Sequence, residues 1–167
     1  MDDGGVMATA REWIERLGMK PHPEGGYYLE VYRSSRLSGD GVRPCSTAIY
    51  YLLEAGDFSA FHSLTSDEIW HHYQGEPLAI HLLGDGGGGR TVFLGKNPAG
   101  DQRPLLVVPA GCIFAAEPAG GGGEGYSLVG CTVSPGFRFE DFVLLPRREL
   151  LERFPDRDRL IRRLTRD

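Results

Sequence analysis

The middle of the chain shows the short hydrophobic periods of β-strands, and both ends show a helical period. Residues 27–33 are aromatic and β-branched, and residues 47–53 form a continuous apolar run of the kind expected for a strand buried on both faces. Further short segments of the same type are residues 58–64, 68–74, 78–83, 90–95, 105–108, 112–116, 126–133 and 142–145. Ten short strands separated by Gly, Pro and Asp turns predict an all-β sandwich or barrel.

Helices are expected only at the two ends of the chain. Residues 8–17 carry apolar side chains at helical spacing and end at Gly18, which predicts one short amphipathic helix. After the last predicted strand, residues 147–154 and 156–164 predict two more short helices, with Asp156 as the N-cap of the second.

The 167 residues contain neither an internal repeat nor a linker, which predicts one domain over residues 1–167. Its core is expected at about residues 9–146, with C-terminal helices within 147–165. A chain of this length buries roughly 70% of the surface that its unfolded form exposes, so it needs no disulfide or structural metal to fold. Cys45, Cys112 and Cys131 are odd in number and far apart, which indicates small buried side chains in a reducing compartment.

The charge balance argues against two classes of partner. The net charge is −5, from 18 basic and 23 acidic residues, whereas a nucleic-acid-binding face is usually basic. No apolar run approaches the roughly 18–20 residues that a membrane span needs. Residues 1–10 lack the apolar segment of a secretory signal, so we expect a cytoplasmic protein.

Glycine is frequent, with 24 residues, and two runs stand out at residues 86–89 and 120–123. Both runs are expected to be flexible hairpin loops. Neither continues into Gly-Lys-Ser or Gly-Lys-Thr, so a phosphate-binding loop is not indicated.

A spaced motif in the first half of the chain carries most of the candidate chemistry. Gly56, His62, Glu68 and Gly75 have the spacing of a glycine, five residues, His-x-His, three residues, a glutamate, six residues and a glycine, except that Leu64 occupies the second histidine position. This pattern resembles the first signature of cupin barrels. In that signature the histidines and the glutamate normally hold a metal.

The second cupin signature, Pro-x-Gly-x-x-His, is resembled by residues 109–114, with Phe114 at the histidine position. Two of the four usual ligand positions therefore carry side chains that cannot bind a metal. Leu64 and Phe114 are expected to line a ligand pocket with apolar surface, which suits an organic molecule better than a hydrated ion.

Longer matches extend the resemblance over roughly residues 9–165. Their carriers are His-Pro-Glu-Gly-Gly-Tyr-Tyr at 22–28, Ala-Ile-Tyr-Tyr-Leu-Leu at 48–53, Phe-His at 61–62, Asp-Glu-Ile-Trp-His at 67–71, Val-Pro-Ala-Gly at 108–111, Ser-Pro-Gly-Phe at 134–137 and Leu-Ile-Arg-Arg-Leu at 160–164. The chain resembles the cupin-5 family, a domain of unknown function. That resemblance implies a double-stranded β-helix, or jelly roll, like that of dTDP-sugar epimerases, and commonly a homodimer. It implies no particular reaction.

A metal-dependent cupin enzyme is one alternative, with His62 and Glu68 as the metal ligands. Iron, manganese or zinc needs at least three nitrogen, oxygen or sulfur ligands, so His71, His72 or His81 would have to supply a third. Strand alternation puts His72 on the same face as Glu68 and His71 on the opposite face. We expect no cofactor, with a divalent metal held by His62 and Glu68 as the alternative.

A metal-free acid–base site is the leading hypothesis. His62 could remove a proton from a carbon next to a carbonyl, with Glu68 orienting the imidazole or stabilising its cation. Tyr28, Tyr50 or Tyr51 could act as the acid, with Tyr50 as the principal candidate, because the epimerases that the chain resembles use a histidine base and a tyrosine acid. The reaction would be an epimerisation, isomerisation or cyclisation of a carbohydrate or carbonyl compound. A structural His62 bonded to a backbone carbonyl and a non-catalytic binding or sensor module remain as alternatives.

Five further side chains are predicted to bind the small-molecule ligand or to line its pocket. Glu24, Tyr28 and Glu30 would contribute polar groups at the rim, although Glu30 with Arg33 could instead belong to a dimer contact. Trp70 could stack on a ring or sugar face, with core packing as the alternative. His72 would lie on the same strand face as Trp70 and contact the ligand there. The alternative is that His72 is a hydrogen-bonded histidine of the core.

Overall fold

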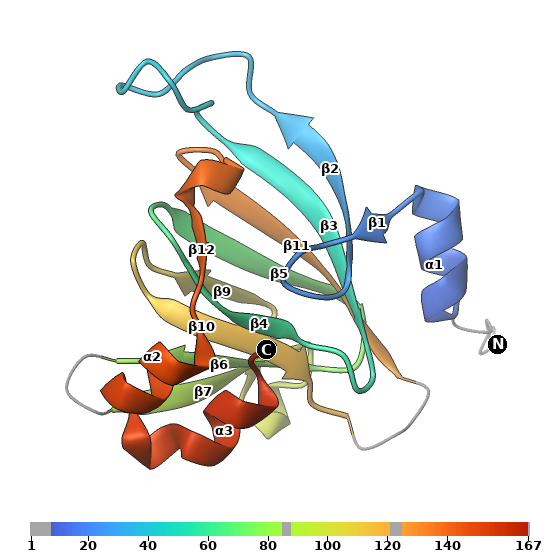
Figure 1. The fold of residues 1–167 in the computed structure, drawn as a ribbon. Coiled ribbons are helices and arrows are strands. Elements are labelled where there is room, and N and C mark those ends of the chain that lie inside the picture. The colour runs from blue at the N-terminus through green and yellow to red at the C-terminus, as the bar shows by residue number, and fades with distance from the viewer. Residues whose placement is uncertain (1–7, 85–87, 121–124, 167) are drawn as a thin grey trace, which may run out of the picture.

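Two six-stranded sheets form the body of the protein in the computed structural model, which describes residues 8–84, 88–120 and 125–166 (Figure 1). In spatial order, the first sheet contains β1 (Lys20–Pro21), β2 (Tyr27–Arg33), β3 (Thr47–Glu54), β11 (Tyr126–Ser134), β5 (Asp67–Gly75) and β9 (Leu105–Val108). The second contains β12 (Phe142–Leu144), β4 (Ser59–Leu64), β10 (Ile113–Pro118), β6 (Leu78–Leu83), β7 (Gly89–Leu94) and β8 (Gln102–Arg103). Neighbouring strands are antiparallel except β7 and β8. This is the predicted jelly roll.

All ten predicted strands are present, within one or two residues of their expected ends. β1 and β8 were not predicted, because two residues are too short to show a period of two. β3 is buried less completely than its apolar sequence predicts, since residues 48–50 are only half-buried. The N-terminal helix packs on the outer side of this sheet. It covers Leu52 and Leu128 but leaves the other end of β3 uncovered.

The N-terminal helix α1 (Ala10–Leu17) ends where its sequence predicts but begins two residues later than expected. Thr9 is the N-cap: its side chain accepts the backbone N–H of Glu12 at 3.3 Å, and the Glu12 carboxylate accepts the backbone N–H of Thr9 at 2.7 Å. Gly18 ends the helix in the left-handed conformation, with φ of 66°. The apolar side of α1 packs on the outer face of the first sheet (Figure 1).

Replacing Thr9 with alanine is expected to lower the free energy of unfolding by about 1 kcal/mol, because the Glu12 N–H loses its acceptor. Chemical denaturation of the purified protein measures this change. Thr9→Ser keeps the hydroxyl and is the matched control, so equal losses in the two variants would contradict the capping role.

The C-terminal segment covers the outer face of the second sheet with α2 (Arg147–Arg153), the 3-10 helix η3 (Pro155–Arg157) and α3 (Asp158–Arg163) (Figure 1). Its buried side chains are Leu150, Phe154, Ile161 and Leu164, which pack on Phe61, Leu83, Ile113 and Ala115 of the sheet. The prediction of Asp156 as an N-cap is wrong. Pro155 begins a 3-10 turn that includes Asp156, and the N-cap position of α3 belongs to Arg157, which makes no capping hydrogen bond.

The space between the sheets is apolar at one end and polar at the other. Inward-facing side chains such as Leu53, Trp70 and Val129 form the main core. At the opposite end of the same strands, the inward positions hold Thr47 and Glu68 instead. One end of the barrel is therefore filled by apolar side chains, and polar side chains line a cavity at the other end.

The two glycine runs fall largely on residues 85–87 and 121–124, so the predicted hairpin loops there lie outside the described residues. Among the described helices, none combines the length and apolar character needed to span a membrane.

Candidate functional site

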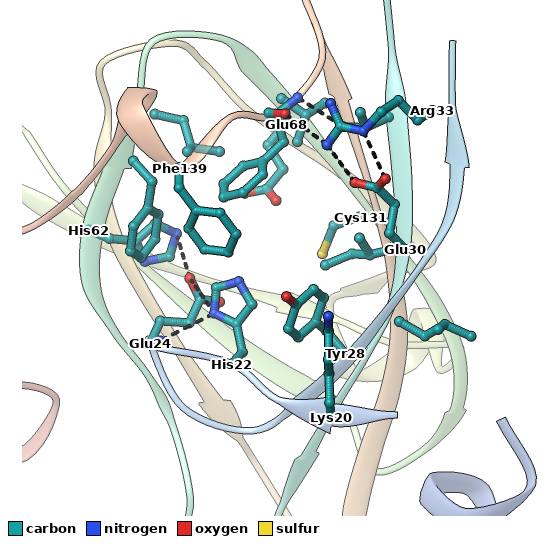
Figure 2. Close-up of a pocket in the computed structure, with 17 residues that line it drawn as sticks. Lys20, His22, Glu24, Tyr28, Glu30, Arg33, His62, Glu68, Cys131 and Phe139 are labelled. Atoms are coloured by element: carbon teal, nitrogen blue, oxygen red, sulfur yellow. Dashed lines mark hydrogen bonds and ion pairs between the residues drawn. The ribbon is translucent and has the colours of Figure 1, made fainter. Parts of the chain in front are cut away.

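A cavity of about 250 Å³ occupies the open end of the barrel (Figure 2). Its walls come from β1 and the loop that follows it, from β2 to β5, from β11, from the segment that joins β11 to β12 and from β12 itself. The aromatic side chains that line it are Tyr28, Phe137, Phe139 and Phe142. Carboxylates, imidazoles and a thiol lie among these rings, so the cavity combines apolar walls with a few polar groups, as small-molecule sites usually do.

His62 projects from β4 into this cavity and is 2% exposed. Its Nδ1 lies 2.7 Å from the carbonyl oxygen of Ala60. Because a carbonyl can only accept, Nδ1 carries a proton, and Nε2 is the ring nitrogen directed into the cavity. Nε2 lies 3.4 Å from Glu24 Oε2, so an imidazole nitrogen faces a carboxylate oxygen inside the pocket.

The sequence Glu-Gly-Gly explains how Glu24 reaches this position. Gly25 and Gly26 have φ of 119° and 71°. A Cβ on Gly26 would lie 2.6 Å from the carbonyl oxygen of Leu52, and one on Gly25 would collide with the carbonyl oxygen of Phe58. The Tyr51 hydroxyl donates to the Gly25 carbonyl at 2.7 Å and holds the turn against the barrel. Two glycines thus let the loop approach closely enough to bury the Glu24 carboxylate.

His22 lies on the other side of Glu24. The backbone N–H of Glu24 donates to His22 Nδ1 at 3.2 Å, so the proton of the neutral ring lies on Nε2. Burial lowers the pKa of His22, an effect that the nearby Glu24 charge opposes in part. Figure 2 shows the second ring nitrogen of His22 pointing toward the cavity. His22 therefore offers a neutral N–H donor to a bound molecule.

Glu68 comes from the start of β5 and is 7% exposed. Within the described residues, its buried Oε2 has no hydrogen-bond partner. Burial, and then the negative charge of Glu24, raise the pKa of Glu68 to about 8 against hydrogen bonding with Trp70 and Cys131, which lowers it, so the carboxyl is mostly protonated at neutral pH. The neighbouring Cys131 is also buried, and burial raises its pKa well above the usual range, which argues against a thiolate nucleophile.

Charged side chains line one side of the cavity. Arg33 donates to both oxygens of Glu30, at 2.8 and 2.7 Å, and to the carbonyl oxygen of Phe137 at 3.2 Å. Lys20 Nζ lies 5.3 Å from the centre of the Tyr28 ring. Figure 2 places these groups on the side of the cavity formed by β1 and β2.

Six of the predicted site residues line this one cavity: Glu24, Tyr28, Glu30, His62, Leu64 and Glu68. The carboxylate partner of His62 differs from the prediction. Glu24 lies beside His62 Nε2, whereas Glu68 was expected there. The expected bond from His62 to a backbone carbonyl is also present, and it leaves Nε2 directed at Glu24.

Four predicted residues are not among those that line the cavity. Trp70 and Phe114 belong to the main core, with their ring centres 6.0 Å apart. The Phe114 ring also packs on the His62 ring, with 4.2 Å between the ring centres. His72 is buried and donates from Nε2 to the Glu76 carbonyl at 2.9 Å. Tyr50 lies on the other face of the first sheet, edge-on to Tyr73.

The histidines considered as a third metal ligand lie elsewhere. As predicted, Glu68 and His72 share the buried face of β5, whereas His71 is on the partly exposed face. His81 is held in the second sheet by Thr91 Oγ1 at 2.9 Å and Glu117 Oε1 at 3.0 Å. Among the described residues, no group of three or more His, Cys, Asp or Glu side chains could hold a metal ion. The available donors therefore do not fit the metal centre of other cupins.

We expect zinc, iron and manganese to be well below one ion per chain in protein purified without chelator, because no three donors of the described residues are placed to share one ion. Elemental analysis of the purified protein measures the content. One tightly held ion per chain, lost in His62→Ala, would contradict this expectation.

Several lining residues were missed in the sequence. His22 was not among the predicted site residues, although the motif around it was one of the carriers of the family resemblance. Phe137 and Phe139 come from the connection between β11 and β12, which has no hydrophobic periodicity, and Phe142 begins the predicted strand β12, so no pattern marked the three as pocket residues. Cys45 was expected to be buried but is exposed, because it lies in the loop between β2 and β3.

Comparisons with known proteins agree with this architecture. An X-ray structure of a protein from Shewanella oneidensis is 39% identical, with a TM-score of 0.90 over 96% of this chain and 99% of that one. A hypothetical protein from Leishmania major is 35% identical, with a TM-score of 0.88 over 96% of this chain and 100% of that one. Oxalate decarboxylase from Bacillus subtilis shares the fold at 15% identity, with a TM-score of 0.56 over 87% of this chain and 36% of that one.

A search of curated proteins found no match. The sequence profile of the Cupin superfamily (DUF985) matches residues 11–145. This match spans most of the chain and agrees with the jelly-roll sheets and with the spaced signature around His62. The chain belongs to the Cupin superfamily (DUF985).

Proposed function

We propose that the cavity binds a small organic metabolite and catalyses metal-independent proton transfer on it. The reaction class is epimerisation, isomerisation or cyclisation of a carbohydrate or carbonyl compound. The observation that carries this proposal is the buried pair of His62 Nε2 and Glu24 Oε2, 3.4 Å apart on the cavity wall. Two groups that both accept protons face each other there, and one proton can be shared between them.

The pair can act as a general base because its parts are held in place. The Ala60 carbonyl fixes the proton on Nδ1, so a second proton can only enter at Nε2 or on the carboxylate. After the imidazole takes a proton, the adjacent Glu24 carboxylate stabilises the cation. This arrangement gives Glu24 the partner role that the sequence suggested for Glu68.

The walls of the cavity support a carbon-rich ligand. Phe139 and Phe142 provide flat apolar surfaces, and Leu64 occupies a position where metal-binding cupins carry a ligand. A volume of about 250 Å³ suits a metabolite of sugar size. Apolar rings can cover the C–H face of such a molecule while the polar groups bond its oxygens.

A non-catalytic binding or sensor module is the second candidate. It is favoured by the bond from His62 to Ala60, which a purely structural histidine would also make. A binding module would hold the ligand without exchanging its carbon-bound hydrogens with solvent. Incubation of the bound ligand in D₂O separates the two functions, because an acid–base enzyme replaces those hydrogens by deuterium.

Screening by thermal shift against aldoses, ketoses and 2-oxo acids is the first test of ligand binding. A ligand at 100 times its Kd should add about 2.7 kcal/mol to the free energy of unfolding, which corresponds to about 5–10 °C in Tm for a chain of this size. Ile49→Trp, which places an indole in the cavity, is the control and should abolish the shift. A shift that persists in this variant would place the binding elsewhere.

A further inference from the structure

We infer that Glu68 meets the ligand as a neutral carboxylic acid that donates a hydrogen bond to a carbonyl oxygen. The substrate class of this site is then small carbonyl compounds that carry a C–H bond next to the carbonyl. This inference rests on the proposed function and specifies its substrate. Glu68 would then act as the acid, and the His62–Glu24 pair as the base.

The first support is an unsatisfied polar atom on the cavity wall. Glu68 lines the cavity and is 7% exposed, yet its Oε2 has no partner among the described residues. A buried polar group without a partner costs roughly 1–3 kcal/mol. A ligand atom that completes this hydrogen bond would recover that free energy, so the group marks a contact point for the ligand.

The surroundings of Glu68 favour the neutral acid over the carboxylate. No ion pair to Glu68 occurs among the described residues, and Arg33 is already bound to both oxygens of Glu30. Glu24, a second carboxylate in the same cavity, disfavours a negative charge on Glu68. An ionised Glu68 would be an unpaired buried charge, whereas the protonated form is a donor that an uncharged oxygen can accept.

His22 supplies a second neutral donor to the cavity. Its Nδ1 is occupied by the backbone N–H of Glu24, so the ring proton is on Nε2, and Figure 2 shows that nitrogen directed inward. Glu68 and His22 are thus two uncharged donors in a cavity that also contains a base. Donors of this kind stabilise the negative charge that develops on a carbonyl oxygen when the adjacent C–H bond is broken.

The resulting step is balanced without any co-reactant other than water. The His62–Glu24 pair takes the proton from the carbon next to the carbonyl, and the electrons of that C–H bond form a C=C bond. The π electrons of the carbonyl move to its oxygen, which receives the proton of Glu68. Return of the first proton to the carbon and of the other to Glu68 restores both groups. If water protonates the opposite face of the carbon instead, the pair releases its proton to the resulting hydroxide, and the product is the epimer.

The ligand test uses L-erythrulose, an open-chain ketose, and erythritol, its polyol counterpart without a carbonyl. We expect L-erythrulose to bind at least 10-fold more tightly than erythritol, as measured by ligand-observed NMR. A difference of this size is about the contribution of one hydrogen bond to the carbonyl oxygen. Equal affinity for the two would overturn the carbonyl assignment but leave the proposed function standing. Binding of neither would overturn the proposed function and this inference with it.

Glu68→Gln and Glu68→Ala test the donor. Glutamine keeps a neutral donor but has no proton to give, so L-erythrulose should bind within about 3-fold of the unaltered protein, whereas alanine should lose about 10-fold. Equal losses in both variants would overturn the donor role. Glu117→Gln, a carboxylate outside the cavity that is bound to His81, is the matched control and should bind L-erythrulose unchanged.

Infrared difference spectroscopy tests the same assignment without a ligand. At pH 7, Glu68→Gln should remove one carboxylic-acid C=O band, and Glu117→Gln should remove a carboxylate band. Loss of a carboxylate band in Glu68→Gln would overturn the inference while leaving ligand binding, and therefore the proposed function, unaffected. Thermal unfolding of each variant establishes that it is folded before either comparison is made.

Discussion

Replacing His62 with glutamine is expected to slow deuterium exchange into the carbon next to the carbonyl of bound L-erythrulose by a factor of about 10²–10⁴. The variant removes the imidazole that accepts the proton and leaves Glu24 without the cation that it stabilises. The rate is measured in D₂O from the loss of the C–H signal by proton NMR, at ligand concentrations that saturate the protein.

His81→Gln is the matched control for this experiment. His81 is also buried and makes two side-chain hydrogen bonds, to Thr91 and Glu117, but it lies outside the cavity. Its variant should exchange deuterium at the unaltered rate once folding has been verified. An unchanged rate in His62→Gln, or equal losses in the two variants, would remove His62 from the role of base.

The second large effect concerns the dependence of stability on pH. The pKa of Glu68 is raised from its usual value of 4.5 to about 8 in the folded state. The folded protein therefore binds this proton more tightly than the unfolded chain does. The contribution of Glu68 to stability is complete below about pH 4.5 and is lost progressively as the pH rises through about 8.

A shift of this size corresponds to about 5 kcal/mol between the two ends of the window. We therefore expect Glu68→Gln to gain stability relative to the unaltered protein as the pH rises from about 5 to about 9. Urea unfolding of both proteins across this range measures the difference. Comparing the two proteins removes the contributions that they share. One of these comes from His22, whose lowered pKa makes stability rise with pH below about pH 6.5, opposite to the effect of Glu68.

A flat difference across the same range would contradict the protonated state of Glu68. Glu117→Gln gives a useful comparison, because hydrogen bonding to His81 lowers the pKa of Glu117. Its ionised form is the one that the fold stabilises, so this variant should not reproduce the alkaline gain of Glu68→Gln.

Local patterns were enough to predict most of the fold. Strand alternation placed Glu68 and His72 correctly on one face of β5, and Gly18 marked the C-terminal end of α1 at the residue expected. These features depend on neighbours in sequence. Asp156 was misplaced because Pro155 supports a 3-10 turn as well as a helix start, and the local pattern does not distinguish the two.

The candidate site was only partly predictable, because its key contact joins distant segments. Glu24 meets His62 through the close approach of Gly25 and Gly26 to the barrel wall, which no periodic pattern encodes. Tyr50 was chosen from a continuous apolar run, where both faces look alike. The register of β3 turns Tyr51 inward instead, where it packs on Trp70. The homodimer and the cytoplasmic location stay predictions.

A crystal structure of protein purified without chelator and soaked with L-erythrulose, with anomalous diffraction data, tests the central claim most directly. We expect the carbonyl oxygen of the ligand within hydrogen-bond distance of Glu68 and its neighbouring carbon beside His62 and Glu24, with no anomalous peak in the cavity. A fully occupied metal ion coordinated by His62 Nε2 and the Glu68 carboxylate would contradict the account.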